Sequence, residues 1–336
     1  MADDTERPPL LSVRDLTVTF AAHGATAQAV RGVDFDLAAG ETVGIVGESG
    51  SGKSVTALAI MGLLAGNAKI NGSIKLNGRE LVGMDRRHLR KIRGKQVGMV
   101  FQDPLTSLNP VIPIGKQLAE ALRIHNPDLS RRHARDRSVE LLQMVSIPDA
   151  RRRLDNYPFE LSGGMRQRVM IAMAMSNEPS LVIADEPTTA LDVTIQAQVL
   201  EVLQQLQREH DVGVMLFTHD LGVVAGLVKR VLVMYAGRVV ESGAVDPVFD
   251  EPGHPYTRGL LACLPRLDRP RFELVPIKGA PPSAAHIPSG CAFHPRCPQA
   301  TARCVAEDPT LLDHGPTRAA CHYADDVRRL PLTASA

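Results

Sequence analysis

Short apolar runs alternate with longer stretches of helical spacing along most of the chain. Residues 42–46 and 181–184 are almost wholly apolar, as buried strands are. Residues 16–20 alternate apolar and polar side chains, which indicates a strand with one buried face. Similar short runs occur at residues 33–37, 72–76, 97–101, 212–217 and 231–235. Strands separated by helical segments predict an α/β fold with a mainly parallel sheet.

A helical block interrupts this alternation, and a change of composition follows it further along the chain. Residues 117–124, 131–145 and 164–175 have helical spacing with no strand between them, so we predict a helical subdomain over about residues 103–178. From about residue 251 prolines, histidines and cysteines become frequent. We therefore predict one domain over residues 1–250 and a C-terminal extension over 251–336. The small residues at 21–29 predict a loop.

The composition is that of an ordinary globular protein. Hydrophobic residues make up 44% and charged residues 22%, and the net charge is +1. A net charge so near zero argues against nucleic acid held on a basic surface. No apolar run reaches the roughly 18 residues that a membrane span needs, and the N-terminus does not resemble a signal peptide. We expect a cytosolic protein whose membrane role, if any, comes through a partner.

A glycine-rich segment carries the clearest chemical signal. Residues 47–54 fit G-x-x-x-x-G-K-[ST], between the predicted strand 42–46 and an apolar helix at 55–64. In such a loop the peptide N–H groups surround a phosphate at a helix N-terminus. Lys53 would reach the β- and γ-phosphates, and the Ser54 hydroxyl would bind Mg²⁺. The predicted ATP-binding residues are Gly47, Glu48, Ser49, Gly50, Ser51, Gly52, Lys53, Ser54 and Val55.

Polar side chains follow three other predicted strands. The run 181–184 ends in Asp185 and Glu186, at the sheet edge where α/β proteins bind ligands. Asp185 would help to hold Mg²⁺, and Glu186 could orient or deprotonate water. Gln102 could reach the metal or the attacking water. His219 would lie at the same edge and contact the γ-phosphate.

A Ser-Gly-Gly sequence at residues 162–164 opens the predicted helix 164–175. On local grounds it is either an anion-binding helix terminus or a plain N-cap. Together with the segment 47–54, Gln102, the pair at 185–186, Ala190-Leu191-Asp192 and His219, it resembles the ABC-type ATPases over residues of about 10 to 240. The discriminating feature is the Leu-Ser-Gly-Gly sequence that begins at Leu161.

This resemblance implies a phosphate-loop ATPase core with an antiparallel β subdomain and an inserted helical subdomain. It also implies a head-to-tail dimer with a second ABC ATPase, identical or a sister, in which the signature residues of one protomer close over the partner's ATP. The signature residues are Leu161, Ser162, Gly163, Gly164 and Gln167. The resemblance also implies that Glu186 is the general base, that His219 is the switch on the γ-phosphate, and that Gln102 links the metal to the transport partner. Asp192 would lie at the dimer contact, and Phe20 would stack on the adenine.

A narrower resemblance covers nearly the whole chain. Residues 100–110, 161–169 and 253–257, with Pro281-Pro282 and residues 293–297, are similar to the ATPase subunits of dipeptide/oligopeptide importers. This resemblance implies ATP-driven import through two permease subunits, an extracytoplasmic peptide-binding protein, and a peripheral position at the cytoplasmic face of the cell membrane. Nickel and glutathione importers share the pattern. A soluble cassette ATPase acting on nucleic acid or ribosomes is a further alternative, which the single cassette disfavours.

All five cysteines lie in the last quarter of the chain. Cys263 lies in an apolar segment and is predicted to be a small core residue. The other four are Cys291, Cys297, Cys304 and Cys321. No two of them have the C-x-x-C spacing. Four thiolates suit zinc or an iron–sulfur cluster. The resemblance to peptide-importer subunits, some of which carry a [4Fe–4S] cluster, favours the cluster, with Zn²⁺ as the alternative.

Overall fold

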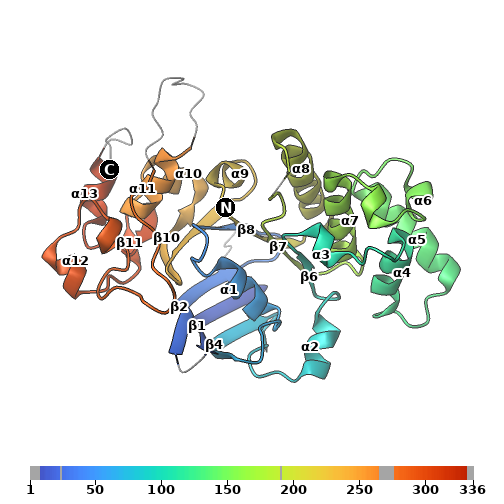
Figure 1. Ribbon diagram of the computed structural model, residues 1–336, viewed down its shortest axis with the longest axis horizontal. Helices are drawn as coiled ribbons and strands as arrows, with labels where there is room; N and C mark the ends of the chain where they lie inside the picture. The colour runs from blue at the N-terminus through green and yellow to red at the C-terminus, as the bar shows by residue number, and fades with distance from the viewer. Residues whose placement is uncertain (1–7, 23–24, 190, 265–275, 331–336) are drawn as a thin grey trace. The chain divides into compact units, whose positions relative to one another are not determined.

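The computed structural model describes residues 8–22, 25–189, 191–264 and 276–330. It separates into two compact units (Figure 1). The first comprises Met1–Leu10, Leu37–Glu41 and Gly83–Leu216, and the second comprises Leu11–Asp36, Thr42–Val82 and Phe217–Ala336. Ala190, one residue of the predicted ABC motifs, lies outside the described residues.

An antiparallel sheet in the second unit has the strand order β2-β1-β4-β5. Its strands are β1 Leu11–Ala22, β2 Ala25–Leu37, β4 Ala68–Leu76 and β5 Arg79–Glu80. Leu11 lies opposite Leu76 and Phe20 opposite Ala68, so the β1–β4 pairing extends over most of both strands. The antiparallel β subdomain is confirmed. The loop predicted at 21–29 is wrong, because β2 already begins at Ala25 and its small side chains obscure the strand alternation.

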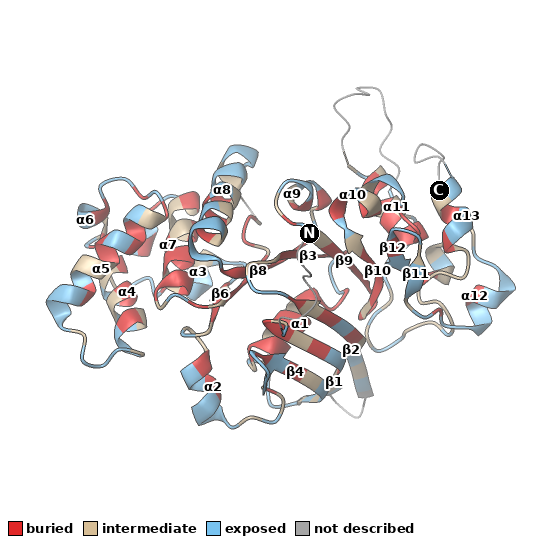
Figure 2. Cartoon of the chain, turned by 180° about the vertical axis from the view of Figure 1, so that it is seen from behind, coloured by how far each residue is buried: buried red, intermediate tan, exposed pale blue. Residues whose placement is uncertain are grey.

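The second unit also holds five strands in the order β11-β12-β10-β9-β3, in which β11 is Leu312–His314 and β12 is Thr317–Ala319. Strand β3 Thr42–Val46 is buried throughout (Figure 2). It pairs in parallel with β9 Arg230–Tyr235. Strand β10 Arg238–Ala244 runs antiparallel to β9. Burial on both faces explains why the sequence of β3 is continuously apolar rather than alternating. Helix α1 Lys53–Ile60 follows β3 in the chain. The short helix α9 Leu221–Ala225 follows β8 Gly213–Thr218, and the short helix α10 Val245–Asp250 follows β10.

The first unit contains β6 Val97–Val100, β7 Leu181–Asp185 and most of β8 Gly213–Thr218. Strands β6 and β7 pair in parallel, with Val97 opposite Leu181. Gly98 permits close packing, because a Cβ there would lie 2.4 Å from the carbonyl oxygen of Ala174. The helices of this unit are α2 Arg86–Ile92, α3 Pro104–Ser107, α4 Ile114–Arg123, α5 Arg131–Met144, α6 Ala150–Arg153, α7 Gly163–Met175 and α8 Val193–His210, with a 3₁₀ turn at Pro158–Glu160.

Residues after 250 extend the second unit. They form α11 Pro255–Ala262, a 3₁₀ turn at His294–Arg296, α12 Ala302–Ala306, β11 Leu312–His314, β12 Thr317–Ala319 and α13 Ala324–Arg329. Strand β12 pairs with β10, placing Glu241 opposite Ala319. The buried Glu241 carboxylate accepts hydrogen bonds from the N–H groups of Gly253 (2.6 Å) and His254 (3.0 Å). The predicted domain boundary between residues 250 and 251 stays a prediction.

Two sequence expectations can be compared with these elements. Cys263 is exposed at the C-terminal end of α11, so its assignment to the core is wrong. The helix ends at Ala262, and Cys263 follows as its C-cap, where the helix no longer covers the side chain. None of the helices in the described part of the chain combines the length and apolar character that crossing a bilayer requires.

Candidate functional site

The segment 47–54 forms a tight turn between β3 and α1. Gly47 has φ 157° and a Cβ there would lie 2.2 Å from the carbonyl oxygen of Met234. Gly52 has φ 102°, and a Cβ there would lie 2.6 Å from the carbonyl oxygen of Ala29. Both positions therefore exclude a side chain. The loop returns on itself, with the N–H of Ser51 donating to the carbonyl oxygen of Glu48 (3.2 Å).

The start of α1 has the features of an anion site. Its N-cap is Gly52, no side chain caps the first turn, and no acidic residue lies in that turn. The buried ammonium of Lys53 donates to the carbonyl oxygens of Gly47 (2.6 Å) and Glu48 (3.1 Å). The ammonium therefore lies over the loop. A phosphate chain would be stabilised here by peptide N–H groups, by the partial positive charge of the helix terminus and by Lys53.

Two other predicted residues belong to the same unit. His219 is exposed and directly follows the last residue of β8, Thr218. The next residue, Asp220, caps α9 through a hydrogen bond from the N–H of Gly222 (2.8 Å). Phe20 lies half-buried near the end of β1. The structure therefore places His219 at the carboxyl end of its strand, as expected from the sequence.

The residues predicted to activate water lie in the first unit and contact each other there. Asp185 is buried at the end of β7, and Glu186 follows with φ 47°, a left-handed conformation that is rare for glutamate. Such conformations cost free energy and cluster at functional sites. The amide of Gln102 donates to the Glu186 carboxylate (3.2 Å), and so does the hydroxyl of Thr189 (2.9 Å). Sequence reasoning missed Thr189, since a threonine after the acidic pair carries no distinctive spacing.

The Leu-Ser-Gly-Gly segment opens α7 in the first unit. Ser162 is exposed and is the N-cap, accepting a hydrogen bond from the N–H of Met165 (3.3 Å). Gly164 lies against α8, since a Cβ there would be 2.4 Å from Cγ2 of Ile195. Leu161 and Gln167 are buried. The structure thus presents Ser162 and the half-buried Gly163 at the surface, but not the Gln167 side chain.

Asp192 is exposed at the start of α8, where its carboxylate accepts a hydrogen bond from the N–H of Ile195 (3.0 Å). Gly163 lies beside the preceding residue, because a Cβ there would be 3.3 Å from Cδ2 of Leu191. The signature and Asp192 are therefore neighbours within the first unit. The segment 47–54 and His219 belong to the second unit.

Four cysteines predicted to bind metal, Cys291, Cys297, Cys304 and Cys321, line one small cavity. Burial raises the pKa of the Cys297 thiol to about 11 and that of Cys321 to about 12. Among the described residues, however, no group of three or more His, Cys, Asp or Glu side chains is arranged to hold a metal ion. The structure brings the thiols together without forming a ligand shell, and the predicted iron–sulfur or zinc site is not supported by this arrangement.

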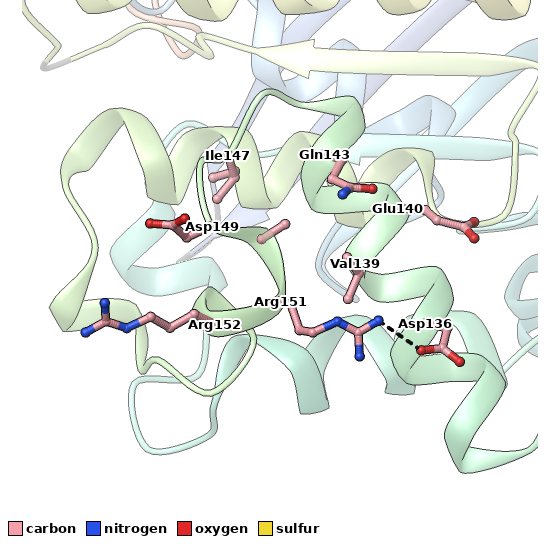
Figure 3. Close-up of a pocket in the computed structure, with 9 residues that line it drawn as sticks. Asp136, Val139, Glu140, Gln143, Ile147, Asp149, Arg151 and Arg152 are labelled. Carbon is pink, nitrogen blue, oxygen red and sulfur yellow. Dashed lines mark ion pairs between the residues drawn. The ribbon is translucent and has the colours of Figure 1, made fainter.

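A separate hollow in the first unit contains none of the predicted site residues. It lies beside α5 and α6, and an ion pair joins Arg151 to Asp136 across it at 3.6 Å (Figure 3). Most of its lining side chains are polar or charged, among them Glu140 of α5 and Asp149, the N-cap of α6. It carries no arrangement of residues that resembles a catalytic centre.

Comparison with known proteins identifies the family. Residues 30–189 match the model of the ABC transporter family, and residues 240–304 match the model described as the oligopeptide/dipeptide transporter C-terminal region. The chain is 54% identical over 300 residues to the oligopeptide transport ATP-binding protein OppD of Salmonella typhimurium, covering 89% of each chain. It is 51% identical to the protein of that name from Haemophilus influenzae, covering 92% of this chain and 96% of the relative.

Solved structures agree with this assignment. A dimeric, post-hydrolysis structure of the ATP-binding cassette MJ0796 bound to ADP and Pi superposes with a TM-score of 0.64 at 29% identity. The match covers 70% of this chain and 98% of that cassette. The α/β cassette fold predicted from the sequence is confirmed, as is the ATPase class. This chain belongs to the ABC transporter family of ATPases, within its oligopeptide/dipeptide transport branch.

Proposed function

We propose that this chain is the ATP-hydrolysing subunit that energises import of di- and oligopeptides. The observation that carries the proposal is the similarity to OppD proteins over about nine tenths of the chain, together with the matching C-terminal region at residues 240–304. These similarities favour peptides over nickel or glutathione as the transported solute. A soluble cassette acting on nucleic acid or ribosomes is likewise disfavoured.

ATP would bind to the segment 47–54 at the N-terminus of α1. The peptide N–H groups and the Lys53 ammonium would hold its phosphates. Glu186 would accept a proton from the attacking water, with Gln102 and Thr189 fixing its carboxylate. His219 would contact the γ-phosphate, and Phe20 would stack on the adenine. These assignments rest on the motif positions and on the hydrogen bonds within each unit.

Mg²⁺ is the expected companion of ATP, and it would neutralise phosphate charge and orient the triphosphate. The predicted ligands are Ser54, Gln102 and Asp185. Their hydroxyl, amide and carboxylate oxygens are the hard donors that this ion prefers, so the residue types fit. Asp185 is almost completely buried at the end of β7.

The working unit would be a dimer of ATPase subunits, identical or sister chains. Exposed Ser162 and half-buried Gly163 would face the second protomer's ATP, and exposed Asp192 would lie at the dimer contact. Since Gln167 is buried, it would support α7 rather than touch the nucleotide. The further partners would be two permease subunits and an extracytoplasmic peptide-binding protein. The chain itself would bind peripherally at the cytoplasmic face of the membrane.

A [4Fe–4S] cluster on the four cysteines, with Zn²⁺ as the alternative, belongs to this proposal only as a separate hypothesis. Four thiols around one cavity support it, whereas the lack of a ligand arrangement among the described residues does not. Iron and acid-labile sulfide would be measured in anaerobically purified protein. Stoichiometric zinc, or the absence of any metal, would contradict the cluster.

The main proposal is tested by purification from solubilised membranes of the source cells. Identified partners should include two membrane-spanning subunits, and ATPase activity of the reconstituted complex should rise with a peptide-loaded binding protein. Stimulation by nickel or glutathione instead of peptides would show that the transported solute is not a peptide of this class. Co-purification with RNA or ribosomes would contradict transport altogether.

A further inference from the structure

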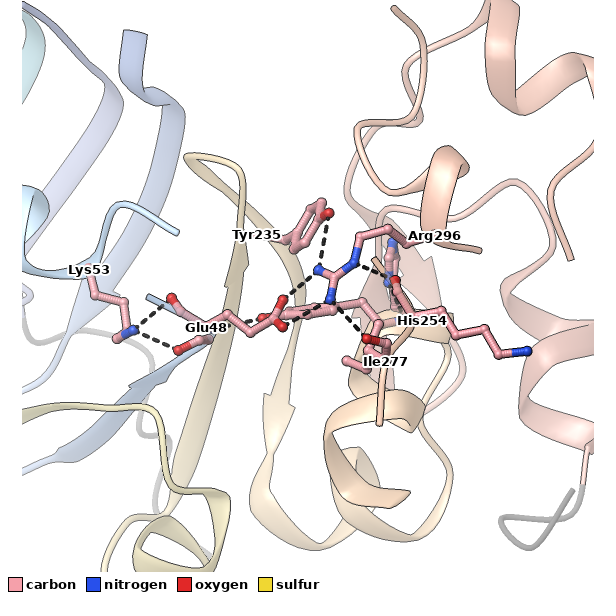
Figure 4. A network of polar contacts seen from close by, with 9 residues as sticks. Glu48, Lys53, Tyr235, His254, Ile277 and Arg296 are labelled. Atoms are coloured by element: carbon pink, nitrogen blue, oxygen red, sulfur yellow. Dashed lines mark hydrogen bonds and ion pairs between the residues drawn. The ribbon is translucent and has the colours of Figure 1, made fainter. Parts of the chain in front are cut away.

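The second residue of the nucleotide loop is held by residues from the far end of the chain (Figure 4). The carboxylate of Glu48 accepts two hydrogen bonds from Arg296, from Nη1 to Oε2 at 2.6 Å and from Nη2 to Oε1 at 3.0 Å. The N–H of Glu48 donates to the hydroxyl of Tyr256 at 2.7 Å. Both the side chain and the backbone of Glu48 are therefore fixed by the segment after residue 250.

Arg296 is built into this position. Its side chain is only 4% exposed, and its Nε donates to the carbonyl oxygen of Lys278 at 3.0 Å. The guanidinium lies 5.8 Å from the ring centre of Tyr235 and 5.9 Å from that of Phe293. A buried guanidinium needs a carboxylate with good geometry, and a two-pronged pair is the strongest form of that contact. The hydrogen bonds to Glu48 raise the pKa of Arg296 above its usual value.

The aromatic residues around Arg296 form a packed support. Tyr235 contacts Tyr256 with ring centres 4.6 Å apart, and it meets Phe293 nearly edge-on at 5.2 Å. All three rings are almost completely buried. Tyr235 ends strand β9, Tyr256 belongs to α11 and Phe293 precedes the 3₁₀ turn that carries Arg296. Packed rings permit few rotamers, so the position of the guanidinium is well defined.

The backbone of Glu48 contacts Lys53 directly. Its carbonyl oxygen accepts hydrogen bonds from Nζ of Lys53 (3.1 Å) and from the N–H of Ser51 (3.2 Å). The orientation of the peptide group at Glu48 thus influences where the Lys53 ammonium lies. A shift of this peptide would move a phosphate ligand and change the shape of the loop.

We propose that Arg296 is a positioning residue for ATP binding: by holding Glu48, it keeps the loop at residues 47–54 in the shape that a triphosphate requires. The inference rests on the assignment of this loop as the ATP site. Its physical basis is preorganisation, because a loop already ordered loses less conformational entropy when the ligand binds. Arg296 would therefore contribute to ATP binding through its contact with Glu48.

The test is a double-mutant cycle in the purified full chain. Arg296→Gln, Glu48→Gln and the double variant are compared for ATP dissociation constant, KM and kcat. Each single variant should raise Kd and KM for ATP about ten-fold, the effect expected from loss of a charge-assisted hydrogen bond. The change in kcat should be smaller. The double variant should be no worse than either single one, since the two residues act through one contact.

A matched control separates this role from a general loss of stability. Arg328 donates to Oγ1 of Thr317 (2.5 Å) and to the carbonyl oxygen of Glu251 (2.9 Å), in the same segment but without contacting Glu48. Arg328→Gln should lower the unfolding temperature and leave the KM for ATP unchanged. Arg296→Lys keeps the charge but loses the two-pronged geometry, so it should restore ATP affinity only in part.

Two results would overturn the inference. One is that Arg296→Gln lowers only the unfolding temperature, as Arg328→Gln does, with unchanged KM. The other is that the effects of Arg296→Gln and Glu48→Gln add. Lys53→Ala tests the assignment of the loop separately: it should remove ATP binding, and unchanged binding in that variant would overturn the loop as the ATP site whatever Arg296 does.

Discussion

The side-chain amide of Gln102 donates a hydrogen bond to the carboxylate of Glu186 across 3.2 Å, although 84 positions separate the two residues in the chain. Strands β6 and β7 pair in parallel, and each residue follows or nearly follows the end of its strand. The carboxyl ends of neighbouring parallel strands meet at one sheet edge, which explains the contact. A carboxylate held in this way is oriented before substrate binds.

Replacing Glu186 with glutamine removes the proposed base and keeps the size of the side chain. ATP hydrolysis should fall by at least about 100-fold, because general-base catalysis contributes on that order, while ATP affinity stays unchanged. Single-turnover hydrolysis and equilibrium ATP binding would be measured on the same preparation. Hydrolysis at the wild-type rate would show that another group accepts the proton.

Thr189→Val removes the second hydrogen bond to the Glu186 carboxylate with little change of volume. Hydrolysis should slow by about ten-fold, since one hydrogen bond to a charged group is lost. Thr189→Ser retains the hydroxyl and should keep most of the activity. The comparison is made by steady-state ATPase rates, and equal rates for the valine and serine variants would exclude a role for the hydroxyl.

Ser162 caps α7, and we propose that it also faces the second protomer's ATP; different substitutions can separate the two roles. Aspartate is as good an N-cap as serine, so Ser162→Asp should keep α7 stable, whereas Ser162→Ala should lose about 1 kcal/mol of stability. The aspartate would repel the second protomer's triphosphate, and its ATPase activity should therefore fall further than that of the alanine variant. Thermal unfolding and ATPase rates are the two measurements. An active aspartate variant would argue against Ser162 facing ATP.

His254 makes stability depend on pH. Burial lowers its pKa from 6.5 to about 3, so the unfolded chain binds a proton that the folded chain refuses. The contribution of neutral His254 to the free energy of unfolding is present above pH 6.5. It is lost as the pH falls from 6.5 toward 3, by up to about 1.4 kcal/mol per pH unit. Burial raises the pKa of nearby Glu241 above its usual value of 4.5. This shift lowers the free energy of unfolding as the pH rises above 4.5, so it opposes the effect of His254.

A substitution isolates the histidine from Glu241. His254 caps α11 by accepting a hydrogen bond from the N–H of Tyr256 at 3.0 Å, and asparagine can form the same cap. His254→Asn should therefore fold at neutral pH and lose less stability than the wild type between pH 6.5 and 5. Denaturant unfolding at a series of pH values gives the difference. Identical pH dependence of the two proteins would show that His254 is not the responsible group.

The sequence alone determined the α/β class, the glycine-rich segment at residues 47–54, the order of the ABC motifs and the helices α4, α5 and α7 of the first unit. These features are local: they depend on short apolar runs, on glycine and lysine at defined spacings, and on helical periodicity within single segments. The sequence was less informative where side chains are small or where a residue lies at the end of an element. The loop predicted over the beginning of β2 and the core position predicted for Cys263 are the two examples.

Only the tertiary structure decided which residues contact one another across long separations. Arg296 and Glu48 lie 248 positions apart, and no periodicity or spacing could pair them. Their contact depends on packed rings from separate parts of the chain, Tyr235, Tyr256 and Phe293. The structure also decided two more local features: the contact of Thr189 with Glu186, three positions before it, and the burial of Gln167 by the packing of its helix. Motifs are local in the sequence, whereas the hydrogen bonds and burial that orient their side chains arise from the folded chain.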